Sequence, residues 1–270
     1  MLRKSRYFAP KHAESFKDQS IAEAYHYRPP YPAETFVSLE GLVKETPRRV
    51  LDAGCGIGYI ARNLVDVVDH IDAVDFSQAM ITEGQSHPNG NHPNIRWLHG
   101  PMETVELEPP YGLITAGESV HWMDWEIVFP RFQQLLVPEG YLVIMKHNTV
   151  PDEWDLLSTI IPRYTTNKDY QSFDMIEELE QVNLFKKVGE KTTVSMLYPQ
   201  SIEDYIASYH SRSGFSCERM GLEQAAAFDQ EAEDILRKLY PDGIVSLQIA
   251  ANIIWGLPGK RGGHFSTALF

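Results

Sequence analysis

The chain has 270 residues, of which 43% are hydrophobic and 23% charged, the composition of an ordinary globular protein long enough for a well-buried core. Its 24 basic and 37 acidic side chains give a formal net charge of −13, spread along the chain, whereas a nucleic-acid-binding protein needs a basic field. Two cysteines are too few for a disulfide framework, and no apolar run has the length of a membrane span or the features of a secretory signal. We therefore expect a cytoplasmic protein that binds neither nucleic acid nor membrane.

The N-terminal residues 1–45 are expected to form a helical cover segment. A polar helical stretch comes first, followed by the turn "YHYRPPYP" and an amphipathic helix from Pro32 to Lys44. The paired prolines prevent any helix from continuing past Arg28, so the chain turns there.

Residues 46–150 alternate short apolar runs with helical segments. Ser77 and Asp124 stand at positions suited to cap two of these helices. Strands and helices alternating at this spacing predict βαβ units, and hence a doubly wound, mostly parallel sheet of the α/β class. The runs expected to form strands are residues 48–53, 70–75, 94–99, 111–117 and 140–147.

Residues 151–256 are expected to supply the remaining strands and a helical cap over the substrate. A helical stretch to about residue 180 precedes a strand candidate at 185–198, two helices at 202–210 and 222–239, and a closing strand at 244–256. The sheet would then have seven strands. The tail, residues 257–270, is expected to be loose.

A glycine-rich turn, "LDAGCGIGYI", follows the first expected strand and opens a helix, which is where nucleotide-binding turns occur. Glycine permits positive φ and lets a ligand approach the backbone closely. The glycines at 54, 56 and 58 alternate strictly, whereas the dinucleotide fingerprint is G-x-G-x-x-G. This spacing disfavours the alternative of a nicotinamide-dependent oxidoreductase.

Two acidic residues indicate what the turn binds. Asp52 lies two residues before the first glycine, where a carboxylate suits a ligand with a cationic end. Asp75 ends the second expected strand, where a carboxylate can accept hydrogen bonds from ribose hydroxyls. A ribose and a cationic amino-acid end, with no demand for phosphate, describe S-adenosylmethionine.

The motifs along residues 20–148 together resemble the class I S-adenosylmethionine-dependent methyltransferases, in the small-molecule branch similar to trans-aconitate methyltransferase. The resemblance implies a Rossmann-like methyltransferase fold and methyl transfer from S-adenosylmethionine. The segments that carry it are "AEAYHYRPPYP" (22–32), "VLDAGCGIG" (50–58), "AVDFSQAMI" (73–81), "HGPMETVEL" (99–107), "YGLITAGESVHWMDW" (111–125) and "LLVPEGYLVI" (135–144).

The resemblance also implies which residues bind the cofactor. Met102 departs from the small residue usual at its position, which leaves a backbone contact with the adenine available. Arg28 could pair with the cofactor's carboxylate. The full expected set is Tyr25, Arg28, Asp52, Gly54, Gly56, Asp75, Phe76, Met80, Met102, Glu103 and Glu118.

His121 is the candidate catalytic residue, because it follows the fourth expected strand at the edge where open α/β folds bind ligands. An orienting role in the pocket floor is the alternative. Trp122 is expected to contact the substrate. Tyr205, Tyr209 and Arg212 fall at helical spacing and are candidates for a roof over the substrate, with an ordinary amphipathic face as the alternative. No histidines have ligand spacing, so no metal site is expected.

The sequence therefore predicts a methyltransferase that moves a methyl group from S-adenosylmethionine to an oxygen of a small-molecule acceptor, with nitrogen or carbon as alternative acceptor atoms. A protein, peptide or RNA acceptor is the second possibility within this class. A non-catalytic protein that binds S-adenosylmethionine is the third.

Overall fold

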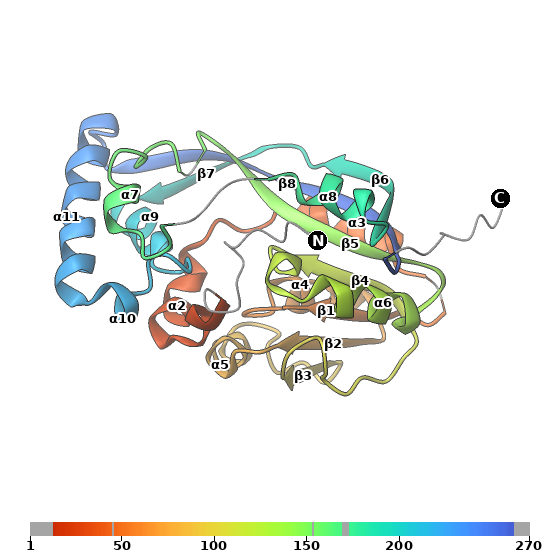
Figure 1. Cartoon of the computed structure of the whole chain (residues 1–270). Helices are drawn as coiled ribbons and strands as arrows, with labels where there is room; N and C mark the ends of the chain where they lie inside the picture. The colour runs from red at the N-terminus through yellow and green to blue at the C-terminus, as the bar shows by residue number, and fades with distance from the viewer. Residues whose placement is uncertain (1–12, 45, 153, 169–172, 262–270) are drawn as a thin grey trace.

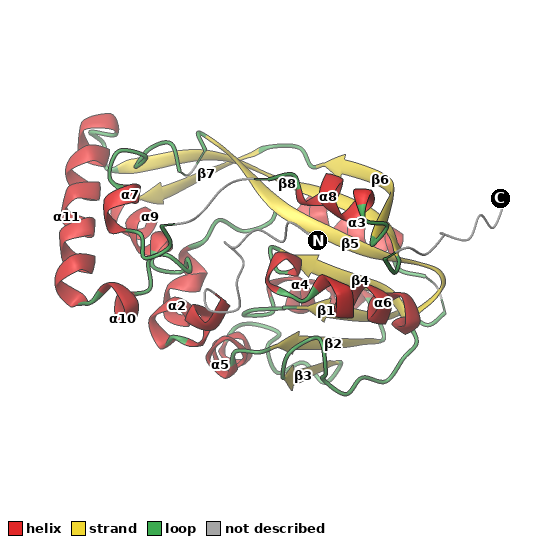
Figure 2. Cartoon of the chain, in the orientation of Figure 1, coloured by secondary structure: helices red, strands yellow, loops and turns green. Residues whose placement is uncertain are grey.

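The computed structural model describes residues 13–44, 46–152, 154–168 and 173–261. Its centre is an eight-stranded sheet in the order β3-β2-β1-β4-β5-β8-β6, with β7 also paired to β8 (Figures 1 and 2). The strands are β1 Arg49–Ala53, β2 His70–Asp75, β3 Ile95–His99, β4 Tyr111–Gly117, β5 Leu136–Val150, β6 Phe185–Thr192, β7 Met196–Ser201 and β8 Ile244–Pro258.

The pairing confirms the predicted Rossmann-like class. Strands β1 to β5 are joined by parallel ladders, and β8 then runs antiparallel to β5, β6 and β7. The apolar runs of the central strands are explained by this arrangement, because parallel strands are covered on both faces.

The single strand expected at 185–198 is two strands, which is why the sheet has eight strands in seven positions. Strand β6 pairs with β8 from Asn252 onwards, and β7 pairs with its earlier half up to Ile249. Between them, Thr193 anchors the chain to β8. Its N–H donates to the Ala251 carbonyl at 3.0 Å and its Oγ1 accepts from the Ala251 N–H at 2.9 Å.

Two side chains cap helices as expected from the sequence. Ser77 accepts a hydrogen bond from the backbone N–H of Met80, and Asp124 accepts one from Glu126. Ser201 caps the helix that follows β7. The helices are η2 Glu14–Lys17, α2 Gln19–Ala24, η3 Tyr25–Tyr27, α3 Ala33–Leu42, α4 Tyr59–Leu64, η4 Val65–Val67, α5 Gln78–Ser86, η5 Val120–Trp122, α6 Trp125–Leu135, α7 Ile161–Tyr164, α8 Met175–Gln181, α9 Ile202–Tyr209, α10 Cys217–Met220 and α11 Leu222–Leu239.

Helices α7, α9, α10 and α11 gather at one end of the molecule and form the cap (Figure 1). The long strands β5 and β8 extend from the central sheet toward it. The cap has its own core, because α11 places Phe228, Ala232 and Leu236 on one helical face against α9.

The ends of the chain are only partly described. Residues 1–12 of the expected cover segment and 262–270 of the expected tail lie outside the described residues. The expected tail begins at residue 257, but Leu257 and Pro258 belong to β8 because the ladder with β6 continues to Pro258.

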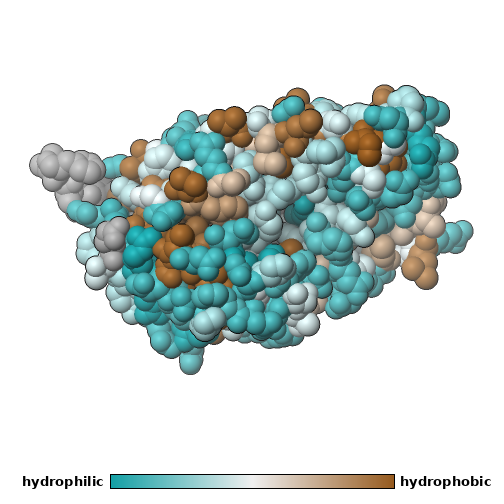
Figure 3. All heavy atoms as spheres, turned by 180° about the vertical axis from the view of Figure 1, so that it is seen from behind, coloured by the Kyte–Doolittle hydropathy of each residue, from teal (hydrophilic) through white to brown (hydrophobic). Residues whose placement is uncertain are grey.

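The helices and the surface of the described residues can be compared with what a membrane span requires. No helix within the described ranges combines the length and apolarity that a bilayer crossing requires. Seen from behind, the surface is largely hydrophilic, and its apolar side chains form several separate patches (Figure 3).

Candidate active site

A cleft of about 1440 Å³ opens at the carboxyl ends of the central strands. Strand β1 pairs with β2 on one side and with β4 on the other, so the strand order reverses at this point. Open α/β sheets bind ligands at such a switch point. The cleft is larger than the roughly 300–1,000 Å³ of a pocket for one small molecule, so it has room for two.

Two glycines of the turn after β1 are required by packing. Gly54 has φ +69°, and a Cβ there would lie 2.6 Å from the Cβ of Ser119. Gly58 has φ +68°, and a Cβ there would lie 2.2 Å from the indole of Trp97. These glycines let the turn pack against its neighbours.

Gly56 differs from the other two because it has open space on the cleft side. Its φ is +54°, and a Cβ there would have only the ring of Tyr25 nearby, at 3.8 Å. Both residues line the cleft. Gly56 is therefore the position at which a ligand can approach the backbone of the turn.

Asp75, at the end of β2, faces the same part of the cleft. Its Oδ2 accepts from the Gly56 N–H and its Oδ1 from the Ser77 N–H, both at 2.8 Å. Burial raises the pKa of Asp75 to about 6, although these hydrogen bonds act to lower it. A carboxylate offers about four acceptor positions, so two remain for the hydroxyls of a ribose.

Asp52 does not line the cleft, contrary to the expectation from the sequence. It is 1% exposed and faces its cross-strand partner Thr115 on β4, whose Oγ1 donates to Asp52 Oδ1 at 2.9 Å. Burial raises the pKa of Asp52 to about 7, while the Thr115 hydroxyl and the Ala61 backbone N–H lower it. Its carboxylate is thus directed to Thr115 and the Ala61 backbone rather than lining the cleft.

The residues expected on the adenine side line the cleft. Phe76 and Met80 follow β2, and Met80 also packs against Ile21 and Ile57, so it has a core role as well. Met102 and Glu103 follow β3 and line the same side.

The backbone of this turn is held by hydrogen bonds with α6. Glu103 Oε1 accepts from the Asp124 N–H at 2.7 Å, and Arg131 donates to the carbonyl of Glu103 at 2.9 Å. The carboxylate of Glu103 is therefore engaged with the start of α6.

Arg28 lies between the cover segment and the cap. Its guanidinium stacks over the ring of Tyr25 at 4.3 Å and donates to the Oγ and carbonyl of Ser211 at 2.7 and 2.8 Å. Both Tyr25 and Arg28 line the cleft. In the structure, Arg28 thus binds the cap. The sequence predicted only that Arg28 could pair with a carboxylate of the cofactor, and it did not predict this contact.

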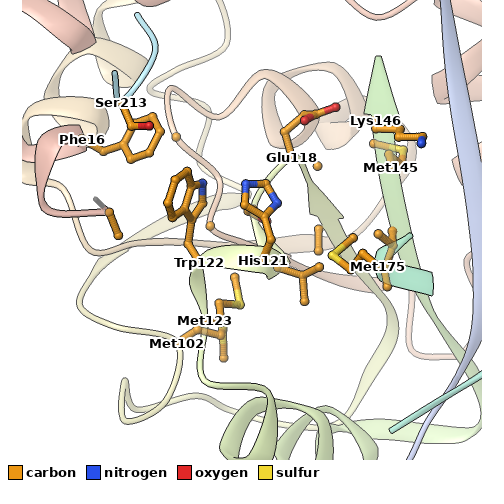
Figure 4. Close-up of a pocket in the computed structure, with 18 of the residues that line it drawn as sticks. Phe16, Met102, Glu118, His121, Trp122, Met123, Met145, Lys146, Met175 and Ser213 are labelled. Atoms are coloured by element: carbon orange, nitrogen blue, oxygen red, sulfur yellow. The ribbon is translucent and has the colours of Figure 1, made fainter. Parts of the chain in front are cut away.

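The loop after β4 brings the candidate catalytic residue to the cleft. Glu118 has φ +52°, and its Oε1 accepts from the His147 N–H at 2.8 Å. The imidazole of His121 points into the cavity beside the ring of Trp122, at 4.8 Å between ring centroids (Figure 4). Phe16 of the cover segment packs edge-on against Trp122 at 5.4 Å.

Tyr205 and Tyr209 lie outside the cleft, so the roof expected from helical spacing is wrong for these two residues. They are 1% and 0% exposed and pack into the core of the cap with Phe215 and Phe228. The same i, i+4 spacing describes a pocket wall and a buried helix face, and only the partner helix decides between them.

Arg212 does line the cleft and is 8% exposed. Its Nη1 donates to the carbonyl of Ser208 at 3.0 Å, and its guanidinium lies over the rings of Tyr209 and Trp154 at 4.5 and 5.2 Å.

His210 fixes the turn that carries Arg212. Its Nε2 lies 2.8 Å from Asp229 Oδ1 and its Nδ1 lies 2.9 Å from the Phe215 carbonyl. Burial lowers the pKa of His210, but the hydrogen bonds to Asp229, Cys217 and Phe215 together raise it to about 10. A charged imidazole therefore joins the end of α9 to α11.

The far half of the cleft contains residues that sequence reasoning missed. They come from β5, β8, α8 and the loops of the cap, and no local motif marks them. Only the antiparallel return of β8 beside β5 brings them together. They include Ile144, Lys146, Trp154, Phe173, Met175, Ile176, Ser213, Phe215, Asn252 and Ile254.

The site has the features of a nucleoside pocket. A side chain at Gly56 would project into the cleft, Asp75 can accept from a ribose, and Phe76 and Met80 offer an apolar surface to a base. Within the ranges described above, no group of three or more His, Cys, Asp or Glu side chains is arranged to hold a metal ion. Fold and site together define a Rossmann-like α/β protein that binds a nucleoside.

Comparisons with known proteins give the family. Residues 50–140 match the family described as methyltransferase domain. The chain is 25% identical over 213 residues to malonyl-[acyl-carrier protein] O-methyltransferase of Halalkalibacterium halodurans, covering 73% of each chain. It is 29% identical over 101 residues to ubiquinone biosynthesis O-methyltransferase of Bradyrhizobium diazoefficiens, covering 37% of this chain and 40% of that one.

The fold comparison agrees. A solved structure assigned as a type II methyltransferase of Anaeromyxobacter dehalogenans aligns with a TM-score of 0.63 at 19% identity, over 86% of this chain and 97% of that one. These similarities support a class I S-adenosylmethionine-dependent methyltransferase, with the family match at residues 50–140.

Proposed function

We propose that this enzyme transfers the methyl group of S-adenosylmethionine to a hydroxyl oxygen of a small-molecule acceptor. The observation that supports this proposal is a cleft of about 1440 Å³ with a nucleoside-like half at Gly56 and Asp75 and a second half beyond His121. His121 stands where the two halves meet.

In this proposal, Gly56, Asp75 and Tyr25 hold the cofactor, with Phe76, Met80 and the backbone near Met102 on the adenine side. S-adenosylmethionine bound there would supply an electrophilic methyl carbon. The acceptor oxygen would form the new carbon–oxygen bond, and the electron pair of the broken carbon–sulfur bond would stay on sulfur. Because this leaving group is already good, the protein mainly aligns the reactants and excludes water.

His121 takes the proton that the acceptor hydroxyl loses. Its neutral imidazole nitrogen accepts that proton, and the resulting imidazolium then releases it to solvent. Phe16 and Trp122 pack beside it and limit the access of water. A carboxylate acceptor would need no base, so a strong dependence on His121 distinguishes a hydroxyl from a carboxylate.

A small acceptor suits the surroundings better than a macromolecule with an acidic surface. The cover segment and the cap are joined over the cleft by Arg28 and Ser211. The rim formed by α8 is acidic at Glu177, Glu178 and Glu180, and the whole chain has a net charge of −13. RNA or an acidic protein would be repelled.

The test is to incubate the protein with methyl-labelled S-adenosylmethionine and a cell extract, and then separate the products by size. We expect the label in a small-molecule fraction, a loss of about a hundredfold or more in His121→Ala, and S-adenosylhomocysteine binding unchanged in that variant. Label in protein or RNA would contradict the small acceptor. Binding without any transfer would indicate a non-catalytic cofactor-binding protein.

A further inference from the structure

The far half of the cleft contains an apolar groove beside α8, which we call the α8 groove. It is lined by Ile144 of β5, Ile254 of β8, and Phe173, Met175 and Ile176 at the start of α8. Ile144 and Ile254 are directly opposed in the antiparallel β5–β8 ladder, so both point to the same face of the sheet. The side chains from α8 pack against that same cluster.

The groove runs up to the candidate catalytic residue. Figure 4 shows Met175 on one side of the His121 imidazole and Trp122 on the other, with Met123 below. All of these residues line one continuous cleft. An acceptor whose hydroxyl lies at His121 therefore has the α8 groove next to it for the rest of its body.

The wall of the groove is adaptable as well as apolar. Met175 forms part of this wall, and Met123 lies near it below His121 (Figure 4). Methionine is unbranched and polarisable, so it fits apolar ligands of varied shape. Ile144 and Ile254 are 4% and 7% exposed, so they form a firm base under this flexible wall.

Charged side chains also line the cleft, and Lys187 is engaged with two of the acidic ones. Lys187 pairs with Glu190 at 3.4 Å, and its backbone N–H donates to Glu180 Oε1 at 3.0 Å. Lys146, which follows Ile144 and Met145 on β5, is exposed. A ligand charge placed against the isoleucine wall would be desolvated at a high cost, whereas a hydrocarbon would be stabilised there.

From this arrangement we infer that the acceptor is a lipophilic hydroxyl compound, such as a phenol or alcohol with an elongated apolar body, and that this body lies in the α8 groove. The inference rests on the proposed function and adds the class of substrate. It excludes short, highly charged acceptors such as dicarboxylates.

The experiment uses a homologous series of 4-alkylphenols (ethyl, butyl and hexyl) as probes. Each is titrated by calorimetry into the full-length protein saturated with S-adenosylhomocysteine. If the alkyl chain enters the groove, affinity should rise by about two- to fourfold for each added CH₂. Labelled methyl should also appear on the oxygen of 4-hexylphenol.

Met175→Gln places a polar group of similar length in the groove, and we expect it to flatten the chain-length dependence without changing the affinity for S-adenosylhomocysteine. The matched control is Met196→Gln, because Met196 is on β7, 39% exposed and away from the cleft. In this control variant, affinity should rise with alkyl chain length as it does in the wild type. Ile176→Gln provides a second test in the groove should Met175→Gln fold poorly.

Three results would overturn the inference: no dependence on chain length, malonate binding more tightly than 4-hexylphenol, or equal series in Met175→Gln, Ile176→Gln and wild type. The proposed function fails in a different way, because the labelling experiment with cell extract would then show no methyl transfer to any small molecule, whatever the phenol titrations give. The two failures are therefore distinguishable.

Discussion

Replacing Gly56 by alanine should separate ligand binding from folding, because this glycine alone of the three in the turn has open space toward the cleft. At φ +54° an alanine is strained by about 1–2 kcal/mol. The new Cβ would meet only the Tyr25 ring at 3.8 Å, an ordinary contact, so no clash adds to that strain. For a chain of this size, each kcal/mol lowers Tm by about 2–4 °C.

Gly58→Ala is the matched comparison. Its Cβ would lie 2.2 Å from the Trp97 ring, and that ring is held by a 2.8 Å hydrogen bond from its Nε1 to the Gly90 carbonyl. The same ring atom, Cη2, would lie 2.6 Å from a Cβ at Gly84, so the ring has little room to move. Overpacking of about 1–3 kcal/mol therefore adds to a backbone strain of about 1–2 kcal/mol.

The assay measures Tm by calorimetry and S-adenosylhomocysteine affinity at a temperature where both variants remain folded. We expect Gly56→Ala to keep most of its stability and lose at least about tenfold in affinity, since its methyl group occupies the ligand side of the turn. Gly58→Ala should lose more stability and less affinity. Wild-type affinity in Gly56→Ala would refute the assignment of this turn as the cofactor contact.

Two further predictions concern pH. Burial raises the pKa of Asp75 to about 6, and in the proposed site ribose hydroxyls would donate to its ionised form. The affinity for S-adenosylhomocysteine should therefore be full above pH 6 and fall as pH drops through that value. Asp75→Asn should remove this pH dependence in calorimetry, and an acid limb that persists in the variant would assign it to another group, such as Asp52. The pKa of His210 is raised from 6.5 to about 10, so its stabilisation is fully present below pH 6.5 and is lost as pH rises toward 10. Asp229→Asn should lower the free energy of unfolding at pH 7 by about 1–3 kcal/mol, a range that allows for the 46% exposure of Asp229. In denaturant titrations, the difference between variant and wild type should shrink toward pH 10. A difference that stays constant with pH would argue against a charged His210.

The cofactor half of the site could be predicted from the sequence because its parts are local. The glycine turn, Asp75 and His121 each follow a strand that its own apolar run identifies, and the ends of parallel strands meet at one edge. Position in the chain therefore nearly determined position in space. Which glycine faces the ligand was not predictable, because the distinction depends on Trp97, Ser119 and Tyr25, which come from distant segments.

The acceptor half could not be predicted, because its residues meet only through long-range pairing. Ile144 and Ile254 are 110 positions apart and become neighbours when β8 returns beside β5. Tyr205 and Tyr209 show the converse error. Their helical spacing and the helix at 222–239 were both predicted, but the packing of that helix, α11, against these two tyrosines was not. The break at Thr193 likewise depends on Ala251 of β8 and has no local turn signal.

The cover segment contacts both halves of the cleft and so connects them. Tyr25 lies over Gly56 in the cofactor half, and Arg28 stacks on Tyr25 while donating twice to Ser211 of the cap. Asp18 extends the same connection, because its carboxylate binds the guanidinium of Arg219 at 2.6 and 3.2 Å. The segment that lies over Gly56 is thus hydrogen-bonded to the cap, beside the half of the cleft where we propose that the acceptor binds. Since methyl transfer depends on alignment and exclusion of water, this shared wall serves both halves at once.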